Sequence, residues 1–332
     1  MIRRLVAYRE GEPHDVLTVA ELPDDPAPGP GSQVTLAVHA VGLNFLDVML
    51  CRGTYPVRPD PPVTPGVEVA GRVVAASADA GHLLGQHVLA CPTLPHGALG
   101  DRVTVDANLT VPRPVGISAV DAAALPVTYQ TAWFALERAG VRAGDVVLIH
   151  AGAGGVGIAA TQLAVARRAR VICTAGGPEK VALCRRNGAS LAIDYHAADF
   201  VTEVRAATRG TGVDVVLDPV GGDVFTRSLD CLAFEGRIVV IGAAGGPPPP
   251  VDPMRLVAAN ATVVGLSWGS AYPWQRPDAV RAAYQAIFDL HAEGAVRPPV
   301  SRVVTLDETP QALSDLATRR TVGKIVVRLE ES

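Results

Sequence analysis

Apolar runs and amphipathic stretches alternate through the middle of the chain and predict strands followed by helices. The runs are apolar on both faces, as a parallel sheet covered by helices requires. Helices are expected between them at 156–169 and 178–188. This alternation predicts a doubly wound α/β domain. Its strands are expected at 145–151, 170–175, 191–195, 213–220 and 236–243.

The first 120 residues carry a different pattern. Small and β-branched residues alternate along 33–44 and 66–77, and proline and glycine separate these runs. Closely spaced strands of this kind predict a barrel-like or sandwich β unit. A helix at 278–294 and the strands after it are expected to return to that unit. The predicted domains are therefore 1–120 with 271–332, and 121–270.

Composition narrows the class of protein. The 332 residues are 48% hydrophobic and 19% charged, which suits a large folded core. The net charge of −4 gives no basic footprint for nucleic acid. No apolar run reaches the roughly 18 residues of a membrane span, and the first residues do not resemble a secretory signal. Five widely spaced cysteines indicate neither a disulfide framework nor a zinc cluster, so a cytoplasmic protein is expected.

Glycines stand between the first strand and the first helix of the α/β domain. Gly152, Gly154 and Gly157 satisfy the pattern G-x-G-x-x-G in the strand–loop–helix context that gives it meaning. Such a loop turns tightly, lets backbone approach a pyrophosphate and packs the helix close to the strand. Amides at the helix start then face the phosphates. The pattern predicts a Rossmann-type domain that binds a dinucleotide.

The end of the second strand indicates which dinucleotide is bound. NAD sites place a carboxylate there to hold the ribose 2′-hydroxyl. The segment 173–177 offers none, and Lys180 follows as a possible partner for a 2′-phosphate. The sequence therefore favours NADPH over NADH, although Lys180 is also compatible with a solvated position on a helix.

Several segments together resemble one family. The stretches 42–56, 64–74, 151–164, 217–225 and 236–246 are similar, in order, to those of the zinc-free quinone oxidoreductases (zeta-crystallin-like) in the medium-chain dehydrogenase/reductase superfamily. The resemblance covers nearly the whole chain. It implies a GroES-like β-rich catalytic domain beside the Rossmann-type domain.

The resemblance also bears on metals. Zinc alcohol dehydrogenases of the superfamily present Gly-His-Glu where this chain has Gly66, Val67 and Glu68, and their cysteine ligand falls near Asn44. Valine cannot ligate a metal, and zinc needs three or four N, S or O ligands. No metal site is expected.

The reaction implied by the resemblance is hydride transfer from NADPH to a small-molecule quinone or to an α,β-unsaturated carbonyl compound. Asn44 is expected beside the nicotinamide or the acceptor carbonyl, where its amide can donate a hydrogen bond. Tyr55 resembles an aromatic residue of the substrate pocket, which could stack on a ring or give a proton; ordinary packing of a loop is an alternative. Asp47 and Glu68 are expected to brace the domain.

This chain departs from the family pattern in two segments. The departures from the family are Arg102 in place of an aromatic residue, and Asp194 and His196 in a segment where relatives have Asn-Tyr-Arg. These last two weaken the preference for NADPH.

The resemblance also implies which residues bind the cofactor. They are Asn44, Thr131, Gly154, Gly155, Val156, Gly177, Lys180, Tyr195, Gly242 and Lys324.

Two other functions compete with this one. A methyltransferase would carry an acidic residue after the second strand and has no place for the first β domain. A nucleotide-binding protein with a structural or regulatory role and little turnover remains open, because cofactor binding alone would satisfy the same motifs. The segment 261–268 resembles the edge strand through which relatives pair, so a homodimer is expected.

Overall fold

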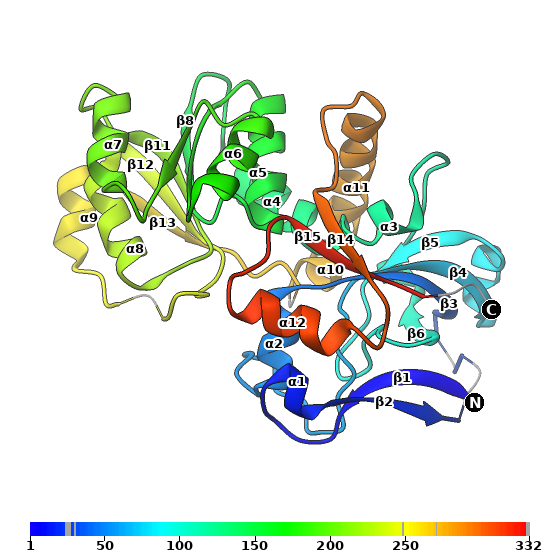
Figure 1. Cartoon of the computed structure of the whole chain (residues 1–332). Helices are drawn as coiled ribbons and strands as arrows, with labels where there is room; N and C mark the ends of the chain where they lie inside the picture. The colour runs from blue at the N-terminus through cyan, green and yellow to red at the C-terminus, as the bar shows by residue number, and fades with distance from the viewer. Residues whose placement is uncertain (24–27, 30, 248, 270, 330–332) are drawn as a thin grey trace. The chain divides into compact units, whose positions relative to one another are not determined.

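The computed structural model describes residues 1–23, 28–29, 31–247, 249–269 and 271–329. Contacts divide the chain into two compact units. The terminal unit comprises residues 1–127 and 298–332, and the central unit comprises residues 128–297. In Figure 1 the terminal unit carries the blue, cyan and red parts of the ribbon.

The terminal unit is built on a seven-stranded sheet with the order β14-β15-β3-β4-β5-β7, in which β6 pairs with β3. Only β14 and β15 pair in parallel; the other described pairs of this sheet are antiparallel. A separate antiparallel ribbon joins β1 (Ile2–Ala7) to β2 (Leu17–Leu22). The sheet strands are β3 (Gln33–Gly42), β4 (Val69–Ala76), β5 (His87–Ala90), β6 (Arg102–Asp106), β7 (Thr110–Pro112), β14 (Val300–Val304) and β15 (Lys324–Arg328).

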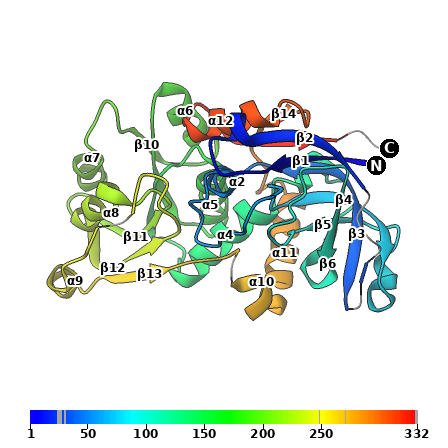
Figure 2. The same ribbon diagram turned by 90° about the horizontal axis from the view of Figure 1, so that it is seen from below.

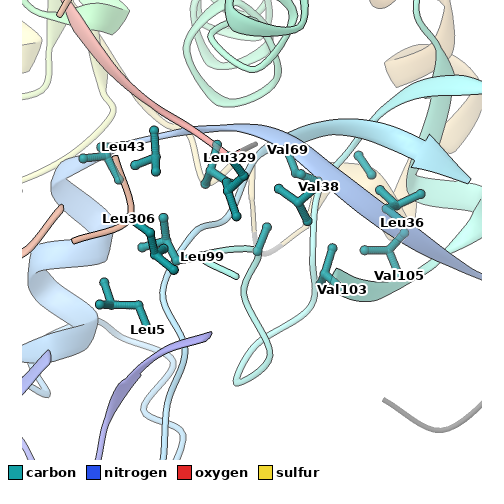
Figure 3. Packing of buried hydrophobic residues seen from close by; sticks show 14 of the residues in the cluster. Leu5, Leu36, Val38, Leu43, Val69, Leu99, Val103, Val105, Leu306 and Leu329 are labelled. Atoms are coloured by element: carbon teal, nitrogen blue, oxygen red, sulfur yellow. The ribbon is translucent and has the colours of Figure 1, made fainter. Parts of the chain in front are cut away.

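Alternate residues of these strands form the core of the terminal unit. On β3, Val34, Leu36 and Val38 are at most 3% exposed. They share one cluster with Leu5 and Leu306, from opposite ends of the chain (Figure 3). Each fully buried side chain of this size contributes about 1.5–3 kcal/mol. The cluster therefore joins the two ends of the sequence into one folded unit.

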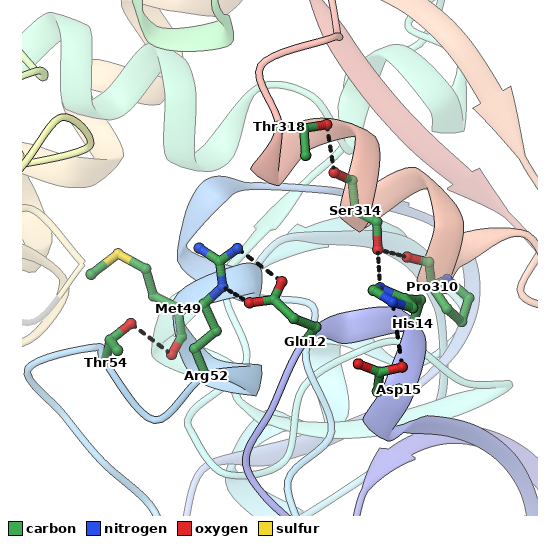
Figure 4. A network of polar contacts seen from close by, with 9 residues as sticks. All are labelled: Glu12, His14, Asp15, Met49, Arg52, Thr54, Pro310, Ser314 and Thr318. Atoms are coloured by element: carbon green, nitrogen blue, oxygen red, sulfur yellow. Dashed lines mark hydrogen bonds and ion pairs between the residues drawn. The ribbon is translucent and has the colours of Figure 1, made fainter.

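Polar contacts also tie the first residues to the last helix (Figure 4). Arg52 donates from Nε and Nη2 to the two carboxylate oxygens of Glu12, both at 2.8 Å, which lowers the pKa of Glu12. His14 Nδ1 lies 3.1 Å from Ser314 Oγ. The helices of this unit are α1 (Pro13–Val16), α2 (Phe45–Cys51), α3 (Ala119–Ala122) and α12 (Thr309–Ala317), with 3-10 turns at Ala78–Leu83 and Ala107–Leu109.

The central unit contains a six-stranded sheet with the order β10-β9-β8-β11-β12-β13. All its strand pairs are parallel, which confirms the predicted doubly wound α/β domain. Figures 1 and 2 show α5 and α6 on one side of the sheet and α7 and α8 on the other. The strands are β8 (Val146–Ile149), β9 (Arg170–Ala175), β10 (Leu191–Asp194), β11 (Val213–Asp218), β12 (Leu232–Val240) and β13 (Thr262–Gly265).

The helices of the central unit follow the predicted alternation with the strands. None of the helices in the described residues is long and apolar enough to cross a membrane. The helices are α4 (Pro126–Arg138, which begins at the unit boundary), α5 (Gly155–Ala166), α6 (Pro178–Arg186), α7 (Phe200–Ala207), α8 (Gly222–Ser228), α9 (Pro253–Ala259), α10 (Tyr272–Gln275) and α11 (Pro277–Ala292), with a 3-10 turn at Leu229–Cys231.

The boundaries of the two units differ from those expected. Residues 271–297 were expected to return to the first domain, but they belong to the central unit. Helix α11 has an apolar face that needs a partner, and α4 lies against it: Gln130 Nε2 donates to Val280 O at 3.2 Å. Phe134 of α4 packs against Tyr272, with ring centroids 4.1 Å apart and the rings tilted by 37°. The chain returns to the terminal unit only at Pro298.

Candidate functional site

The glycine loop lies between β8 and α5, as the motif predicts. A Cβ added to Gly157 would lie 2.3 Å from Ala151 O, and one added to Gly152 would lie 2.7 Å from the Cβ of Cys173. Both positions therefore exclude any larger residue. Gly154 is the N-cap of α5, and Gly155 and Val156 open its first turn. The first amides of a helix have no partner within the helix and can bind an anion.

A neutral histidine supports the strand that leads into this loop, and the sequence analysis did not single it out. His150 directly follows β8 and is 1% exposed. Its Nδ1 lies 2.8 Å from Thr174 Oγ1 and its Nε2 lies 2.8 Å from Ser228 Oγ. Ser228 donates its own proton to Val224 O, so it accepts from His150 Nε2. Burial lowers the pKa of His150 to about 3. A polar residue at the end of an apolar strand was the available signal.

The ends of β9 and β10 bring three predicted residues into one region. Gly177 has φ +87°, which favours glycine, and Lys180 lies in the first turn of α6. Tyr195 follows β10 and is 46% exposed. The Oη of Tyr195 and the Nε2 of His196 lie 2.6 Å and 2.7 Å from the point where Gly176 would carry a Cβ.

The Asp194 carboxylate is engaged by backbone in the same region. Its Oδ1 accepts hydrogen bonds from Gly177 N and His196 N, both at 3.0 Å. These two bonds lower the pKa of Asp194. The residue that departs from the family pattern therefore holds the turn before α6 and places a negative charge beside it.

A buried aspartate that the sequence analysis missed holds the loop after β11. Asp218 Oδ1 accepts from Val220 N at 2.8 Å and Gly221 N at 3.0 Å. Its Oδ2 has no hydrogen-bond partner among the described residues, and burial raises its pKa. Gly242 lies in the loop after β12, where a Cβ would stand 3.3 Å from Pro219 O. Thr131, on α4, is 8% exposed.

A second group of polar residues lies in the terminal unit around Asn44, the N-cap of α2. Asn44 N donates to Asp47 Oδ2 at 2.8 Å, and Gly66 N donates to Asp47 Oδ1 at 2.8 Å. Asp47 is fully buried, and the loss of hydration raises its pKa to about 6 despite these hydrogen bonds. Asp47 thus braces this region, as expected.

Lys324 and Glu68 complete this group. Lys324 Nζ forms an ion pair with Glu68 Oε1 and donates to Asn44 Oδ1 at 2.6 Å. Asn44 Nδ2 donates to Glu68 Oε1 at 2.8 Å and to Gly42 O at 3.3 Å. Glu68 Oε2 accepts from Val127 N at 2.8 Å. The sequence analysis named Asn44 and Lys324 separately and did not predict that they touch.

Tyr55, the other predicted catalytic residue, lies in the loop after α2 and is partly buried. Burial raises the pKa of its phenol. In the described parts of the chain, no three His, Cys, Asp or Glu residues lie where they could hold a metal ion together.

Comparison with known proteins gives consistent matches over the whole chain. Residues 29–115 match the family "alcohol dehydrogenase GroES-like domain", and residues 155–286 match "zinc-binding dehydrogenase". A quinone oxidoreductase-like protein 2 from Bos taurus is 35% identical over 309 residues, 92% of this chain and 87% of that protein.

Solved structures agree with these matches. The quinone oxidoreductase of Thermus thermophilus, described free and in complex with NADPH, has a TM-score of 0.84 and 37% identity. The match covers 98% of this chain and 100% of that one. The CurK enoyl reductase has a TM-score of 0.87 and 27% identity, over 99% of both chains.

Proposed function

Because the chain belongs to the quinone oxidoreductase family of the medium-chain dehydrogenase/reductase superfamily, we propose that it reduces a quinone or an α,β-unsaturated carbonyl compound with NADPH and without zinc. The observation that carries this proposal is the glycine loop before α5, with no carboxylate at the end of β9. The hydride donor is NADPH, which supplies the reducing chemistry when bound.

The residues proposed for NADPH lie in separate parts of the central unit. The first turn of α5, with Gly154, Gly155 and Val156, suits the pyrophosphate. Gly177, Lys180 and Tyr195 suit the 2′-phosphate and the adenosine ribose. Thr131 and Gly242 suit the nicotinamide and its ribose. The related Thermus thermophilus enzyme is described in complex with NADPH, which supports this choice.

The residues proposed for the acceptor lie in the terminal unit. Asn44 holds a fixed amide in contact with the Lys324 ammonium, and Tyr55 offers a phenol. A tyrosine phenol keeps its proton at neutral pH, and burial raises the pKa of Tyr55 further. That proton can hydrogen-bond to the oxygen on which negative charge develops.

Zinc independence is supported by the contacts of the side-chain oxygens of Asn44 and Glu68. A zinc ion would need lone pairs that the Lys324 ammonium already occupies on Glu68 Oε1 and Asn44 Oδ1. Val67, the neighbour of Glu68, is apolar. These residues do not fit a zinc site, so the proposed reaction does not use zinc.

The acceptor class is tested with a small panel. Purified protein is mixed with NADPH and 1,4-benzoquinone, 9,10-phenanthrenequinone, an alkenal or a 2-alkenone, with NADH in parallel. Loss of the nicotinamide absorbance with one acceptor class, and slower loss with NADH, is the expected result. No turnover with any acceptor, while NADPH still binds in a fluorescence titration, would favour a nucleotide-binding protein with little turnover.

We also propose that the protein forms a homodimer through β13. This strand is the edge of the central sheet, and Val263 on it is 38% exposed. Helix α9 lies near it (Figure 2) and has no buried residue; Met254 is 64% exposed and Val257 62%. An exposed apolar edge of this kind favours pairing with a second copy. Light scattering after size-exclusion chromatography tests the homodimer: a monomer mass would contradict the proposal.

The cytoplasmic location of the protein remains a prediction.

A further inference from the structure

Lys324 is a buried lysine in a chain that contains few lysines. Its side chain is 3% exposed and that of Glu68 is 0% exposed. Lys324 and Lys180 are the only lysines among the 29 basic residues, and arginine takes every other position. Ammonium is a compact point charge, whereas guanidinium is a wide planar fork. A chain that otherwise uses arginine therefore carries the compact cation at this buried position.

The ion pair is fully supported by hydrogen bonds, as a buried pair must be. Glu68 uses both oxygens: Oε1 accepts from Asn44 Nδ2 as well as from Lys324, and Oε2 accepts from Val127 N. Lys324 donates to Asn44 Oδ1. The three side chains form a closed ring in which each one touches the other two.

This ring fixes the orientation of the Asn44 amide. An ammonium only donates and a carboxylate only accepts. A flipped amide would place its NH2 group against Lys324 and its oxygen against Glu68, with two repulsive contacts. Both N–H groups of Asn44 are used, by Glu68 Oε1 and Gly42 O. Both amide N–H groups of Asn44 therefore have partners within the protein, and the donor left beside the Asn44 amide belongs to Lys324.

One N–H group of the Lys324 ammonium is not used within this ring. Lys324 Nζ has three N–H groups, and two of them have partners in Glu68 and Asn44. No partner for the third lies in the described ranges of the chain.

We propose that Lys324 is a positioning residue for the reduction: it locks the Asn44 amide and supplies the fixed positive charge that a metal supplies in zinc relatives. This inference rests on the proposed function. Hydride transfer moves two electrons and one hydrogen to the acceptor, which leaves an anionic oxygen on the acceptor and NADP⁺. The field of Lys324 stabilises that oxygen, and water then supplies the proton.

Kinetics of two variants test the inference. Lys324→Met alone leaves Glu68 buried and unpaired, so the informative protein is the double variant Glu68→Gln/Lys324→Met, which removes both charges at similar volume. Its kcat is expected to fall by about 100-fold or more, as for other lost electrostatic stabilisers. The Kd for NADPH should change by no more than about twofold, because an electrostatic effect on the transition state leaves coenzyme binding intact. The matched control is Arg302→Met on the neighbouring strand β14, which removes the ion pair between Arg302 and Asp315 of α12 and should keep the wild-type kcat.

Two results would overturn the inference. An unchanged kcat in the double variant would mean that the ion pair is only structural. A raised Kd for NADPH with unchanged kcat would mean that Lys324 binds the coenzyme directly, as the family resemblance implies.

Nuclear magnetic resonance separates this inference from the proposed function. Selective ¹⁵N labelling of lysine gives signals from only two side chains, Lys180 and Lys324. Slow hydrogen exchange is expected for the Lys324 ammonium in that sample and for the Asn44 side-chain amide in a second sample labelled at asparagine. That amide should exchange faster in the double variant. If the wild-type protein oxidises NADPH with none of the acceptors, the proposed function fails. Equal exchange of the Asn44 amide in both proteins would overturn the positioning role.

Discussion

The carboxylate of Asp47 accepts a hydrogen bond from the backbone N–H of Gly66 through Oδ1 at 2.8 Å. Its other oxygen accepts from the backbone of Asn44, so one buried side chain joins the start of α2 to the segment before β4. The geometry of the Asn44 group depends on this carboxylate.

The stability of the protein should show the titration of Asp47. Burial raises its folded-state pKa to about 6, above the value of about 3.9 for an unfolded chain. Between these values the folded protein binds the extra proton, so this contribution to the free energy of unfolding falls as pH rises from about 4 to 6. A shift of two units corresponds to about 2–3 kcal/mol.

Urea unfolding of wild type and Asp47→Asn from pH 4.5 to 7 measures this effect. The difference between the two free energies should fall across that range by about 2 kcal/mol. Asp278→Asn, at a side chain 93% exposed, should give a nearly constant difference. A constant difference for Asp47→Asn as well would contradict the raised pKa.

His150 should remain neutral in the folded protein over the physiological range. Its pKa of about 3 lies below the usual 6.5, so the unfolded state takes up the proton first. This contribution to stability is present above pH 6.5 and is lost as pH falls towards 3. Imidazole ¹⁵N spectra should show one Nε2–H tautomer that does not change from pH 5 to 8. A signal that titrates near pH 6.5 and vanishes in His150→Asn would refute the assignment.

Two glycines of the loop before α5 should respond differently to alanine. A Cβ at Gly157 meets Ala151 O at 2.3 Å, whereas one at Gly154 lies 3.3 Å from that oxygen. Gly157→Ala should lose about 1–3 kcal/mol through overpacking and lower the Tm by about 3 °C or more. Gly154→Ala should keep its Tm but bind NADPH at least about tenfold more weakly, because the methyl group stands where backbone approaches the pyrophosphate.

Calorimetry and a fluorescence titration compare the two variants. Equal NADPH affinity in Gly154→Ala and wild type would place the pyrophosphate elsewhere.

Asp194 should weaken the preference for NADPH. Its single oxygen Oδ1 accepts both backbone hydrogen bonds, so Asp194→Asn can keep that geometry while it removes the charge. Repulsion of the 2′-phosphate then decreases, and the KM for NADPH should fall by about threefold, a modest effect because exposed charges are screened. The KM for NADH should not change. Lys180→Met is the opposite test and should raise only the KM for NADPH. Parallel changes with both coenzymes would show that Asp194 acts on the fold instead.

Local patterns in the sequence predicted most of the strands and helices of the central unit. The strands β8 to β12 lie where short apolar runs were found, and the glycine loop lies between β8 and α5, because periodicity and turn chemistry are local properties. The partner of an amphipathic helix is not local. Helix α11 was therefore expected in the first domain, whereas it belongs to the central unit.

Long-range contacts explain what was missed at the site. Asn44 and Lys324 are 280 residues apart, so no spacing rule joins them. The family resemblance selected both residues but not their contact. Asp218 and His150 were missed because a single polar residue at the end of an apolar strand does not reveal its partners.

The central claim is hydride transfer from NADPH, and a kinetic isotope effect tests it most directly. NADPH oxidation is measured with the best acceptor of the panel, using coenzyme deuterated at C4 in the 4R or the 4S position. The account predicts turnover that slows with one of the two labels and not with the other, because the bound nicotinamide presents one face. Equal rates with both labels would show that hydride transfer is not rate-limiting, and single-turnover mixing then exposes that step. NADPH consumption with no label effect in a single turnover, or no consumption at all, would contradict the account.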